Sequence, residues 1–306
     1  MPNPELRQML AKGEVFFAPT VWNPPTARLA HHFGFKALYI PGKGTGIMLG
    51  QDEAMTNLTQ TVTVADRVLE SIRYEAPVIV DALSGFGNSD HVQLTVRHLE
   101  GAGVSAIHLG DTDQPARAAT QRKAVSIDQF KQRIGQAVKA RMNKDFLIIA
   151  RLDASSANDP AASRVETVKR ANAVRAAGAD ALFLSNMSPQ ADDLQFYRAQ
   201  IKDIPLATTT NSGAQWFVDQ KGQPLSLDDY KGLGYQLIFY EDVIQPSLLA
   251  VHDVYRKVKD TGYLPDVPEG EDEKAHSIMW RVVGMEEKWA VEAVTTEIGN
   301  KPIAEH

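Results

Sequence analysis

The sequence predicts a closed (β/α)8 barrel, and two observations lead to this fold class. Eight short apolar runs recur along the chain, with stretches of helical character between them. These runs are apolar throughout instead of alternating with polar residues, which is typical of parallel strands buried on both faces. In addition, a helix–glycine–strand connector occurs four times, at Gly34, Gly103, Gly178 and Gly234. A glycine at this position ends a helix in the left-handed conformation and turns the chain into the next strand. Repeated connectors of this kind with eight strands favour a closed barrel.

The expected strands follow one another along most of the chain. A doubly wound open sheet would also alternate strands with helices, but it usually has fewer strands and a Gly-x-Gly-x-x-Gly phosphate turn after the first one. The segment "GKGTG" (42–46) matches that turn only in part and follows the second strand. The open sheet stays as the alternative fold. The expected strands are residues 15–18, 37–40, 78–81, 105–109, 146–151, 181–184, 205–208 and 236–240.

The intervening helices carry ordinary start signals. Ser126, followed by a glutamine three residues later, forms a capping box before "FKQRIGQAVKARM". Thr63 and Asp66 are expected to open the helix "TVADRVLESIRY". Asp90 is expected to cap "HVQLTVRHLE", and Ser226 to cap "LDDYKGL".

The sequence divides into residues 1–262, expected to form the catalytic barrel domain, and residues 263–306, expected to form a linker and a C-terminal helical extension. The segment 264–274 ("LPDVPEGEDEK") is rich in proline and acidic residues, and an amphipathic helical pair follows it. We expect this extension to pack on the barrel or on a neighbouring subunit. Its apolar residues are Met279, Trp280, Val283, Met285, Trp289 and Val294.

Composition excludes several classes of function. The net charge is −6 and the 32 basic residues are scattered, which disfavours nucleic acid as a partner. The absence of cysteine excludes thiolate metal sites and a cysteine nucleophile. A polar N-terminal segment and the lack of any 18-residue apolar run indicate a soluble, cytoplasmic protein that does not bind membranes.

Polar residues stand at the end of every expected strand except the first. In barrels of this kind the active site lies at the C-terminal ends of the strands, so these residues are expected to meet at one rim. They are Tyr39 to Lys43, Asp81, His108 to Asp111, Arg151 with Asp153, Ser185 with Asn186, Thr208 to Asn211, and Tyr240 to Asp242.

Three carboxylates in this set point to a cation. Asp81 and Asp111 end neighbouring strands, and Asp52 lies in the loop after the second strand. Carboxylates around one point repel each other unless a divalent ion lies between them, and Mg²⁺ suits such ligands. Arg151 supplies a planar fork for a substrate carboxylate. Purely structural roles stay open: a strand-end Asp can cap a helix, Arg151 can pair with Asp153, His108 can be a core residue, and Lys43 can be solvated.

Four segments carry a resemblance to one superfamily. "VDALSGFGN" (80–88) resembles the VD-x-DTG-[FY]-G-N signature of the isocitrate lyase/phosphoenolpyruvate mutase superfamily. "AGVSAIHLGD" (102–111) is similar to its AG-x-x-x-IHIED stretch, and "FLIIARLDA" (146–154) to its F-x-I-x-ARTDA stretch. "PTARLAHHFGFKALYIPGKG" (25–44) resembles its N-terminal motif. The match spans residues 10–262 with the motifs in the same order.

This resemblance implies a fold, an assembly and a chemistry. Members are (β/α)8 barrels with a terminal helix swapped between neighbours, usually in tetramers. They bind Mg²⁺ and small 2-oxo or 2-hydroxy carboxylates, and they break or form C–C or C–P bonds through an enolate-like intermediate. The resemblance therefore implies a lyase or hydrolase acting on a small carboxylic acid, oxaloacetate-type decarboxylation being one candidate. It also implies a homotetramer built as a dimer of helix-swapped dimers.

The sequence departs from the superfamily pattern at several positions. The second Asp and the Thr of the DTG motif are Leu83 and Ser84, and the Glu of the IHIED stretch is Gly110. The gating segment, here "DQPARAATQRKA", lacks the catalytic Cys of the lyases. A weakened Mg²⁺ site and a metal-free, more apolar pocket both remain open. The other departures are Leu152 for Thr, Ser185 for Glu, Thr208 for Asn and Asn211 for Glu.

Three hypotheses follow: a cation-dependent carbon–carbon lyase, an enzyme of altered chemistry without metal, and a non-catalytic metabolite-binding or scaffold descendant. In the first, segment 112–124 closes over the site as a lid. The candidate catalytic residues are Asp81, His108, Lys43 and Arg151; the candidate metal ligands are Asp81, Asp111 and Asp52; the candidate substrate-binding residues are Tyr39, Gly42, Lys43, Gly44, Ser84, Arg151, Ser185, Thr208 and Asn211.

Overall fold

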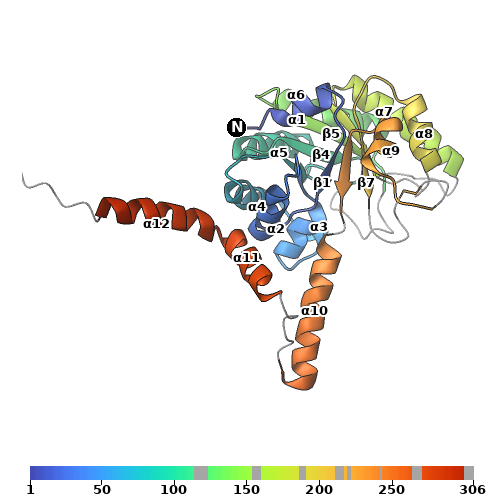
Figure 1. Ribbon diagram of the computed structural model, residues 1–306. Coiled ribbons are helices and arrows are strands. Elements are labelled where there is room, and N and C mark those ends of the chain that lie inside the picture. The colour runs from blue at the N-terminus through green and yellow to red at the C-terminus, as the bar shows by residue number, and fades with distance from the viewer. Residues whose placement is uncertain are drawn as a thin grey trace, which may run out of the picture.

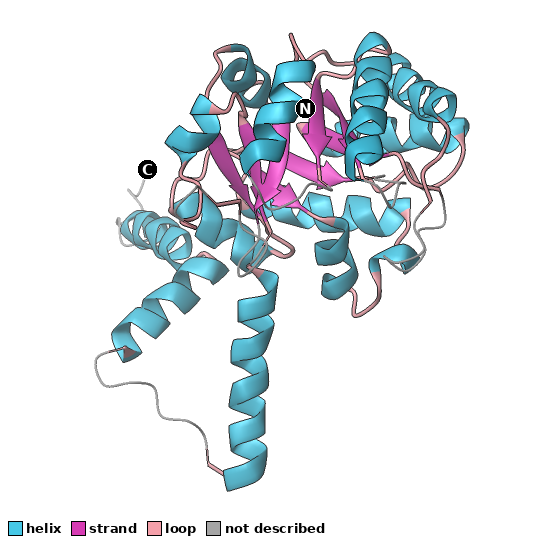
Figure 2. Ribbon diagram, turned by 90° about the vertical axis from the view of Figure 1, so that its right-hand side faces the viewer, coloured by secondary structure: helices cyan, strands magenta, loops and turns pink. Residues whose placement is uncertain are grey.

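The computed structural model describes residues 1–113, 123–153, 160–185, 191–210, 217–218, 222–241, 243–263 and 271–299. Figure 1 shows a barrel of strands surrounded by helices, with a helical arm at the C-terminal end of the chain that extends away from the barrel. The arm and the barrel are seen from a second side in Figure 2.

The described residues contain eight parallel strands, joined in the order β1-β8-β7-β6-β5-β4-β3-β2. A bridge between Thr20 and Tyr39 links the two ends of this series and closes the barrel. Each expected strand is present within two residues of its expected bounds, so the barrel is confirmed and the open sheet is wrong. The strands are β1 (Phe16–Pro19), β2 (Leu38–Ile40), β3 (Val78–Asp81), β4 (Ala106–Gly110), β5 (Leu147–Leu152), β6 (Ala181–Leu184), β7 (Leu206–Thr210) and β8 (Leu237–Tyr240).

Helices cover the outside of the barrel between successive strands (Figure 1). Those of the barrel are α1 (Glu5–Ala11), α2 (Pro24–His32), α3 (Gly42–Met48), the 3-10 helix η1 (Glu53–Met55), α4 (Leu58–Ser71), α5 (Ser89–Ala102), α6 (Ile127–Ala140), α7 (Pro160–Ala176), α8 (Ala191–Gln200) and α9 (Leu227–Gly232). The arm consists of α10 (Ile244–Thr261), α11 (Asp272–Val283) and α12 (Met285–Gly299).

Two of the four expected helix starts are confirmed. The side chains of Ser126 and Ser226 both accept a hydrogen bond from the backbone N–H three residues later, as expected. The expectation for Asp90 is wrong, because Asn88 caps α5 and Asp90 lies in its first turn. Thr63 lies inside α4, which begins earlier because Asn57 forms a capping box at its start.

The four connector glycines all adopt a positive φ, between 75° and 98°. Gly103 is the clearest case, because it ends α5 in the left-handed conformation with φ of 96°. The reason given for these glycines from the sequence is therefore confirmed.

Side chains alternate between the inside of the barrel and the helix layer. Ile79, Ile149, Phe183 and Phe239 belong to the inner core, whereas the residues next to them along each strand belong to the core between strands and helices. This alternation follows from the two-residue period of a strand. It decides which strand-end residues face the centre of the barrel.

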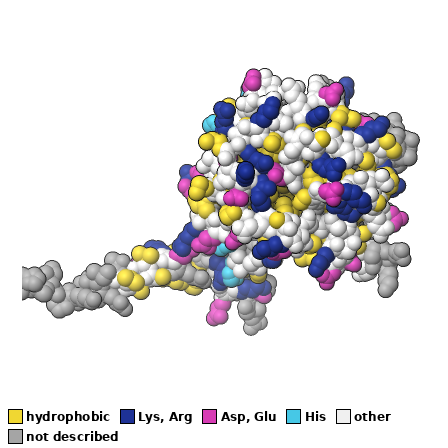
Figure 3. Space-filling view, turned by 90° about the horizontal axis from the view of Figure 1, so that it is seen from above, with side chains coloured by type: hydrophobic (Ala, Val, Ile, Leu, Met, Phe, Trp, Pro, Cys, Tyr) yellow, Lys and Arg dark blue, Asp and Glu magenta, His cyan; other side chains and the backbone are white. Residues whose placement is uncertain are grey.

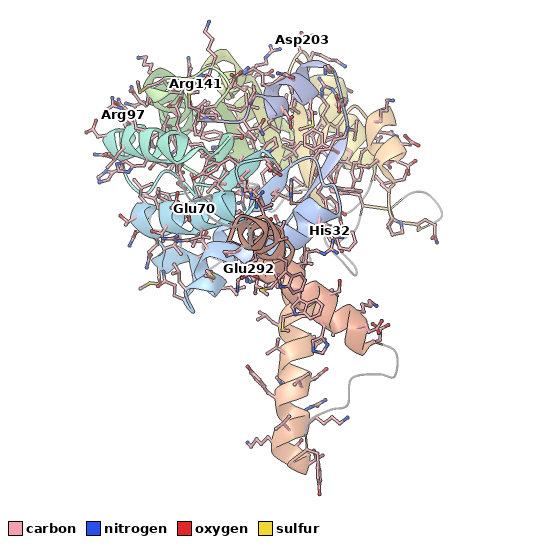
Figure 4. The ribbon with its side chains drawn as sticks, turned by 60° about the vertical axis from the view of Figure 1, so that its left-hand side comes forward. His32, Glu70, Arg97, Arg141, Asp203 and Glu292 are labelled. Atoms are coloured by element: carbon pink, nitrogen blue, oxygen red, sulfur yellow. The ribbon has the colours of Figure 1, made fainter. Side chains whose placement is uncertain are left out.

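The C-terminal arm exposes many apolar side chains in the single chain. Trp280 and Trp289 are 41% and 43% exposed, and their rings meet at a centroid distance of 5.2 Å. The arm touches the barrel where α11 packs against α2, near the His32 that Figure 4 labels. There Arg281 donates a hydrogen bond to the His32 ring, 2.6 Å from Nε2.

The rest of the surface has no large area of one charge on the face seen in Figure 3, where basic and acidic side chains are intermixed. Among the described helices, none is both long and apolar enough to span a bilayer.

Candidate functional site

The candidate site lies at the C-terminal rim of the barrel, where α3 also sits (Figure 1). The inward register of each strand selects the residues that meet there. Ile79 faces inward, and so does Asp81 two residues on; Arg151 continues the inward series of Ile149 in the same way. By this rule Asp153, Ser185 and Glu241 continue the inward series of β5, β6 and β8.

Arg151 is the centre of the site. Its Nη1 donates to Asp81 Oδ2 at 2.8 Å, and its Nε donates to Asp153 Oδ1 at 2.8 Å. Ser185 Oγ donates to the same oxygen of Asp153. The guanidinium carbon lies 5.5 Å from the centroid of the Phe183 ring below it. Two carboxylates and an aromatic face therefore fix the plane of the guanidinium.

Asp81 is almost fully buried and receives hydrogen bonds from several sides. Besides Arg151, Gly42 N–H donates to Oδ2 at 3.2 Å and Leu83 N–H donates to Oδ1 at 2.8 Å. His108 Nδ1 lies 3.3 Å from Oδ1. Burial raises the pKa of the Asp81 carboxyl, but His108, Arg151 and the two backbone N–H groups more than offset this, so its pKa is lowered. Asp81 is therefore a carboxylate at neutral pH.

Tyr39 and His108 form a buried pair beneath Asp81. Their side chains are fully buried, and the Tyr39 hydroxyl lies 3.0 Å from His108 Nε2. Burial lowers the pKa of His108 to about 4 and raises the pKa of Tyr39 well above its usual value. At neutral pH the imidazole is therefore neutral, and Tyr39 keeps its proton and donates it to Nε2. The single N–H proton of the neutral ring then sits on Nδ1, facing Asp81.

The three carboxylates expected to share Mg²⁺ are not grouped around one point, and this expectation needs correction. Asp111 continues the outward series of β4: its Oδ2 lies 3.4 Å from Arg170 Nη1 on α7, and its Oδ1 accepts from the Asp153 N–H at 3.0 Å. Asp52 is exposed, and its Oδ1 accepts from the Ala54 N–H at 2.8 Å, at the start of η1. Within the described residues there is no group of three or more His, Asp or Glu side chains placed to hold a metal ion.

The donors around Asp81 do not suit Mg²⁺. An ion there needs several oxygen ligands or waters at about 2.1 Å. Leu83 supplies an apolar branch instead, with its Cδ2 only 2.7 Å from the point that a Cβ on Gly42 would occupy. Gly110 supplies no side chain, and the Arg151 guanidinium already takes the side of Asp81 that faces Asp153.

Two expected binding residues, Gly42 and Gly44, are used by the protein itself. Gly42 and Gly44 begin α3 instead of forming an open loop, and the Gly42 N–H is used by Asp81. Gly44 packs closely, since a Cβ there would lie 3.1 Å from Pro41 and 3.2 Å from Trp22. The Gly42 N–H therefore does not face a substrate carboxylate, although the sequence placed Gly42 among the substrate-binding residues.

The remaining expected residues are dispersed around the rim. Ser84 Oγ lies 3.3 Å from Thr112 Oγ1. Thr208 is in the outward register of β7 and donates to Leu184 O at 3.4 Å, so it does not face the centre. Leu152, which replaces the Thr of the superfamily motif, likewise belongs to the outer core and does not face the centre. Asn211 and most of segment 112–124 lie outside the described residues.

Glu241 received no role from the sequence, although it stands among the strand-end residues. It is half-buried at the end of β8, on the inward register. Burial raises the pKa of its carboxyl, while Arg151 and Lys43 act in the opposite direction, so the pKa is raised overall. The signal that reveals it is the register of β8, in which Leu237, Phe239 and Glu241 alternate with outward residues.

Comparison with known proteins settles the family. The model of the phosphoenolpyruvate phosphomutase family matches residues 6–255. The chain belongs to the phosphoenolpyruvate mutase/isocitrate lyase family. This agrees with the motifs at 80–88, 102–111 and 146–154, which carried the resemblance from the sequence.

Relatives of this family member carry the names of carbon–carbon lyases. The 2-methylisocitrate lyase of Aeropyrum pernix is 32% identical over 270 residues, which span 87% of this chain and 82% of the relative. The oxaloacetate decarboxylase of Chromohalobacter salexigens is 33% identical over 209 residues, which span 67% of this chain and 70% of the relative.

Solved structures of the family have the same barrel. Oxaloacetate acetylhydrolase in complex with the inhibitor 3,3-difluorooxalacetate aligns with a TM-score of 0.80 and 26% identity, covering 97% of each chain. Phosphonopyruvate hydrolase in complex with oxalate and Mg²⁺ aligns with a TM-score of 0.77 and 26% identity, covering 96% of this chain and 99% of that one.

Proposed function

We propose that this family member is a lyase that cleaves a carbon–carbon bond in a small 2-oxo or 2-hydroxy carboxylic acid. The observation that carries the proposal is Arg151, a fixed guanidinium at the rim of a barrel whose relatives are named as enzymes acting on such acids. The proposal would lose this support if the residue at position 151 were uncharged or had no partners to hold it in place.

Arg151 is suited to bind the carboxylate of the substrate. A guanidinium has five N–H donors, and among the described residues only Nε and Nη1 of Arg151 donate to protein groups. Burial lowers the pKa of the guanidinium, but the negative charges of Asp153 and Asp81 raise it by more than burial lowers it. The pKa therefore lies well above the usual value, and the charge is permanent. The Nη2 amino group can therefore donate hydrogen bonds to an anionic ligand.

The same charge assists the chemical step. When the C–C bond breaks, its electron pair stays on the carbon next to the carbonyl and is delocalised onto the carbonyl oxygen as an enolate. The other fragment departs as CO₂ or, from a hydroxy acid, as a carbonyl compound whose hydroxyl proton passes to a carboxylate of the rim. A fixed cation close to the enolate oxygen stabilises this charge. Arg151 provides it, and Lys43, which lies near enough to Glu241 to act on the pKa of its carboxyl, adds a second positive charge.

The enolate carbon must then gain a proton. The chain has no cysteine, so a thiol cannot supply it. Glu241 has a raised pKa and belongs to the same group of charges, which makes it the carboxyl at this rim best suited to carry a proton. His108 is less suited, because it is neutral at neutral pH and its Nε2 already accepts from Tyr39.

A panel of 2-oxo and 2-hydroxy acids, assayed for release of pyruvate, CO₂ or a carbonyl product, tests the proposal. We expect turnover of at least one acid and a loss of about 100-fold or more in kcat/KM for Arg151→Met. Arg67→Met is the matched control, because Arg67 is exposed on α4 and pairs with Glu70. Binding of oxalate without turnover of any acid would instead identify a non-catalytic carboxylate-binding protein.

We also propose that the protein assembles with further copies of itself through the arm. The apolar side chains exposed along α10, α11 and α12 support this, since a large apolar surface on one chain is a liability unless it is covered. Val251, Val254 and Tyr255 of α10 are 48%, 43% and 71% exposed, in addition to the two tryptophans of α11 and α12.

A further inference from the structure

The Asp81 carboxylate has little capacity left for a metal ion. A carboxylate accepts about four hydrogen bonds, two at each oxygen. Oδ2 accepts from Arg151 and Gly42, and Oδ1 accepts from Leu83 and faces His108 Nδ1 at 3.3 Å. A cation bound directly to Asp81 would have to displace the guanidinium, the strongest of these partners.

The space next to Asp81 is also unfavourable for the water shell of a cation. Leu83 Cδ2 and Glu53 Oε2 lie 2.7 Å and 3.1 Å from one point, the position of a Cβ on Gly42. Asp81 Oδ2 lies 3.2 Å from the same point, so an apolar carbon is closer to it than either carboxylate oxygen. A bound Mg²⁺ keeps several water ligands, and each of these waters donates hydrogen bonds. An apolar side chain cannot accept them.

Two further positions point in the same direction. Gly110 offers no ligand, and a Cβ there would lie 3.1 Å from Asp153 Oδ2. Asp111, the acid that follows, faces the helix layer and lies beside the guanidinium of Arg170. Neither position supplies an oxygen to the centre of the barrel rim.

We propose that this site binds its small carboxylate ligand without a divalent cation, and that Arg151, held between Asp81 and Asp153, is the fixed positive charge in its place. This inference deepens the proposed function and rests on the same site. It also makes a specific statement about the chain: with Leu83 and Gly110 in place of the two carboxylates of the superfamily pattern, Arg151, which that pattern shares, is the positive charge that pairs with Asp81.

The first test is titration of the unmodified protein with Mg²⁺. Binding is measured by calorimetry and by thermal unfolding. We expect no saturable heat below 5 mM Mg²⁺ and a shift in Tm of less than about 1 °C. Stoichiometric Mg²⁺ binding in this range overturns the proposal, whether or not any acid is turned over.

Oxalate is the second probe, because its binding does not depend on turnover. Its Kd is measured in EDTA and in 5 mM Mg²⁺. We expect the two values to agree within about twofold, and Arg151→Met to weaken binding at least tenfold in both. Binding that requires Mg²⁺, or that tightens tenfold with it, overturns the proposal. Failure to bind oxalate under both conditions also counts against it.

A gain of metal binding provides the complementary test. Leu83→Asp with Gly110→Glu places two carboxylates beside Asp81 and Asp153, where their mutual repulsion creates a need for a cation. We expect Mg²⁺ to raise the Tm of this double variant by several degrees, but not that of the uncharged pair Leu83→Asn with Gly110→Gln. Leu83→Asp alone serves if the double variant does not fold, because Asp accepts the φ of 51° at this position more readily than Leu. An equal response of the native chain and the charged variant would refute the proposal.

Discussion

At the scale of single residues, Leu83 combines two unusual properties. Its φ of 51° is in the left-handed region, which costs a residue with a side chain about 1–2 kcal/mol, and its side chain occupies the space in front of Gly42. The hydrogen bond from its N–H to Asp81 explains why the backbone keeps this conformation. The apolar side chain is therefore held at the site by the acid that it adjoins.

Gly42→Ala tests this packing. Its new methyl group would lie 2.7 Å from Leu83 Cδ2, so we expect a loss of about 1–3 kcal/mol in the free energy of unfolding. Leu83→Ala in the same chain removes the clash and should recover a large part of the loss. Chemical denaturation of the two single variants and the double variant measures the coupling, and strictly additive effects would contradict the contact.

His108 makes stability depend on pH. Its pKa is about 4 in the folded protein and near 6.5 in the unfolded chain, because burial disfavours the charged ring. Between these values the unfolded chain binds the proton and the folded one does not, so stability is complete above pH 6.5 and falls as the pH drops toward 4. The expected loss is about 3 kcal/mol.

Urea denaturation at several pH values between 4 and 7 measures this loss. In His108→Gln the side chain does not titrate, so this part of the pH dependence should disappear, even if the variant is less stable at every pH. The same pH slope in both proteins would show that other groups are responsible.

At the scale of elements, the strands were predictable and the helix starts were less so. A strand buried on both faces leaves a continuous apolar run, and all eight were found from such runs. Helix starts depend on single polar residues, and both Asn57 and Thr63 are residue types that cap helices. The structure distinguishes them, because only the Asn57 side chain accepts the Gln60 N–H, at 3.0 Å.

Asn57→Ala and Thr63→Ala form a matched pair for α4. Asn57→Ala should lower the free energy of unfolding by about 1 kcal/mol, because it removes one half of the capping box. Thr63 is exposed inside the helix, so its replacement should change stability by no more than about 0.5 kcal/mol. Equal losses in thermal unfolding would place the helix start elsewhere.

The site was predictable in its residues but not in its pairings. Strand ends identified Asp81, Arg151 and Ser185 correctly as neighbours of one rim. The grouping of Asp81 with Asp111 failed because it used the order of strands and ignored which way each side chain points. Asp81 is on the inward register of β3, and Asp111 is on the outward register of β4. The two-residue period of a strand predicts this difference, whereas the order of the strands around the rim does not.

At the scale of the whole molecule, the exposed apolar side chains of the arm support the proposed self-assembly. Trp280 and Trp289 stack edge to face and are still nearly half exposed, so a second copy would bury them further. We expect the protein to sediment as an oligomer. Trp280→Glu with Trp289→Glu should shift it to smaller species, because a charge would be buried in the contact.

Analytical ultracentrifugation measures this shift. Val165→Glu is a suitable control, since Val165 is 52% exposed on α7 and lies outside the arm. A monomeric native protein, or an oligomer that the tryptophan substitutions leave intact, would remove the arm from the interface.

The contacts of Asp111 have a mechanical consequence. Arg170 on α7 donates hydrogen bonds to Asp111 and to the carbonyl of Val125, just before α6 begins. Asp111 in turn accepts a hydrogen bond from the backbone N–H of Asp153. Asp153 is one of the two carboxylates that accept hydrogen bonds from Arg151. One buried acid thus connects α6 and α7 with the guanidinium, and we expect substitutions at Arg170 to alter the position of Arg151 without contacting it.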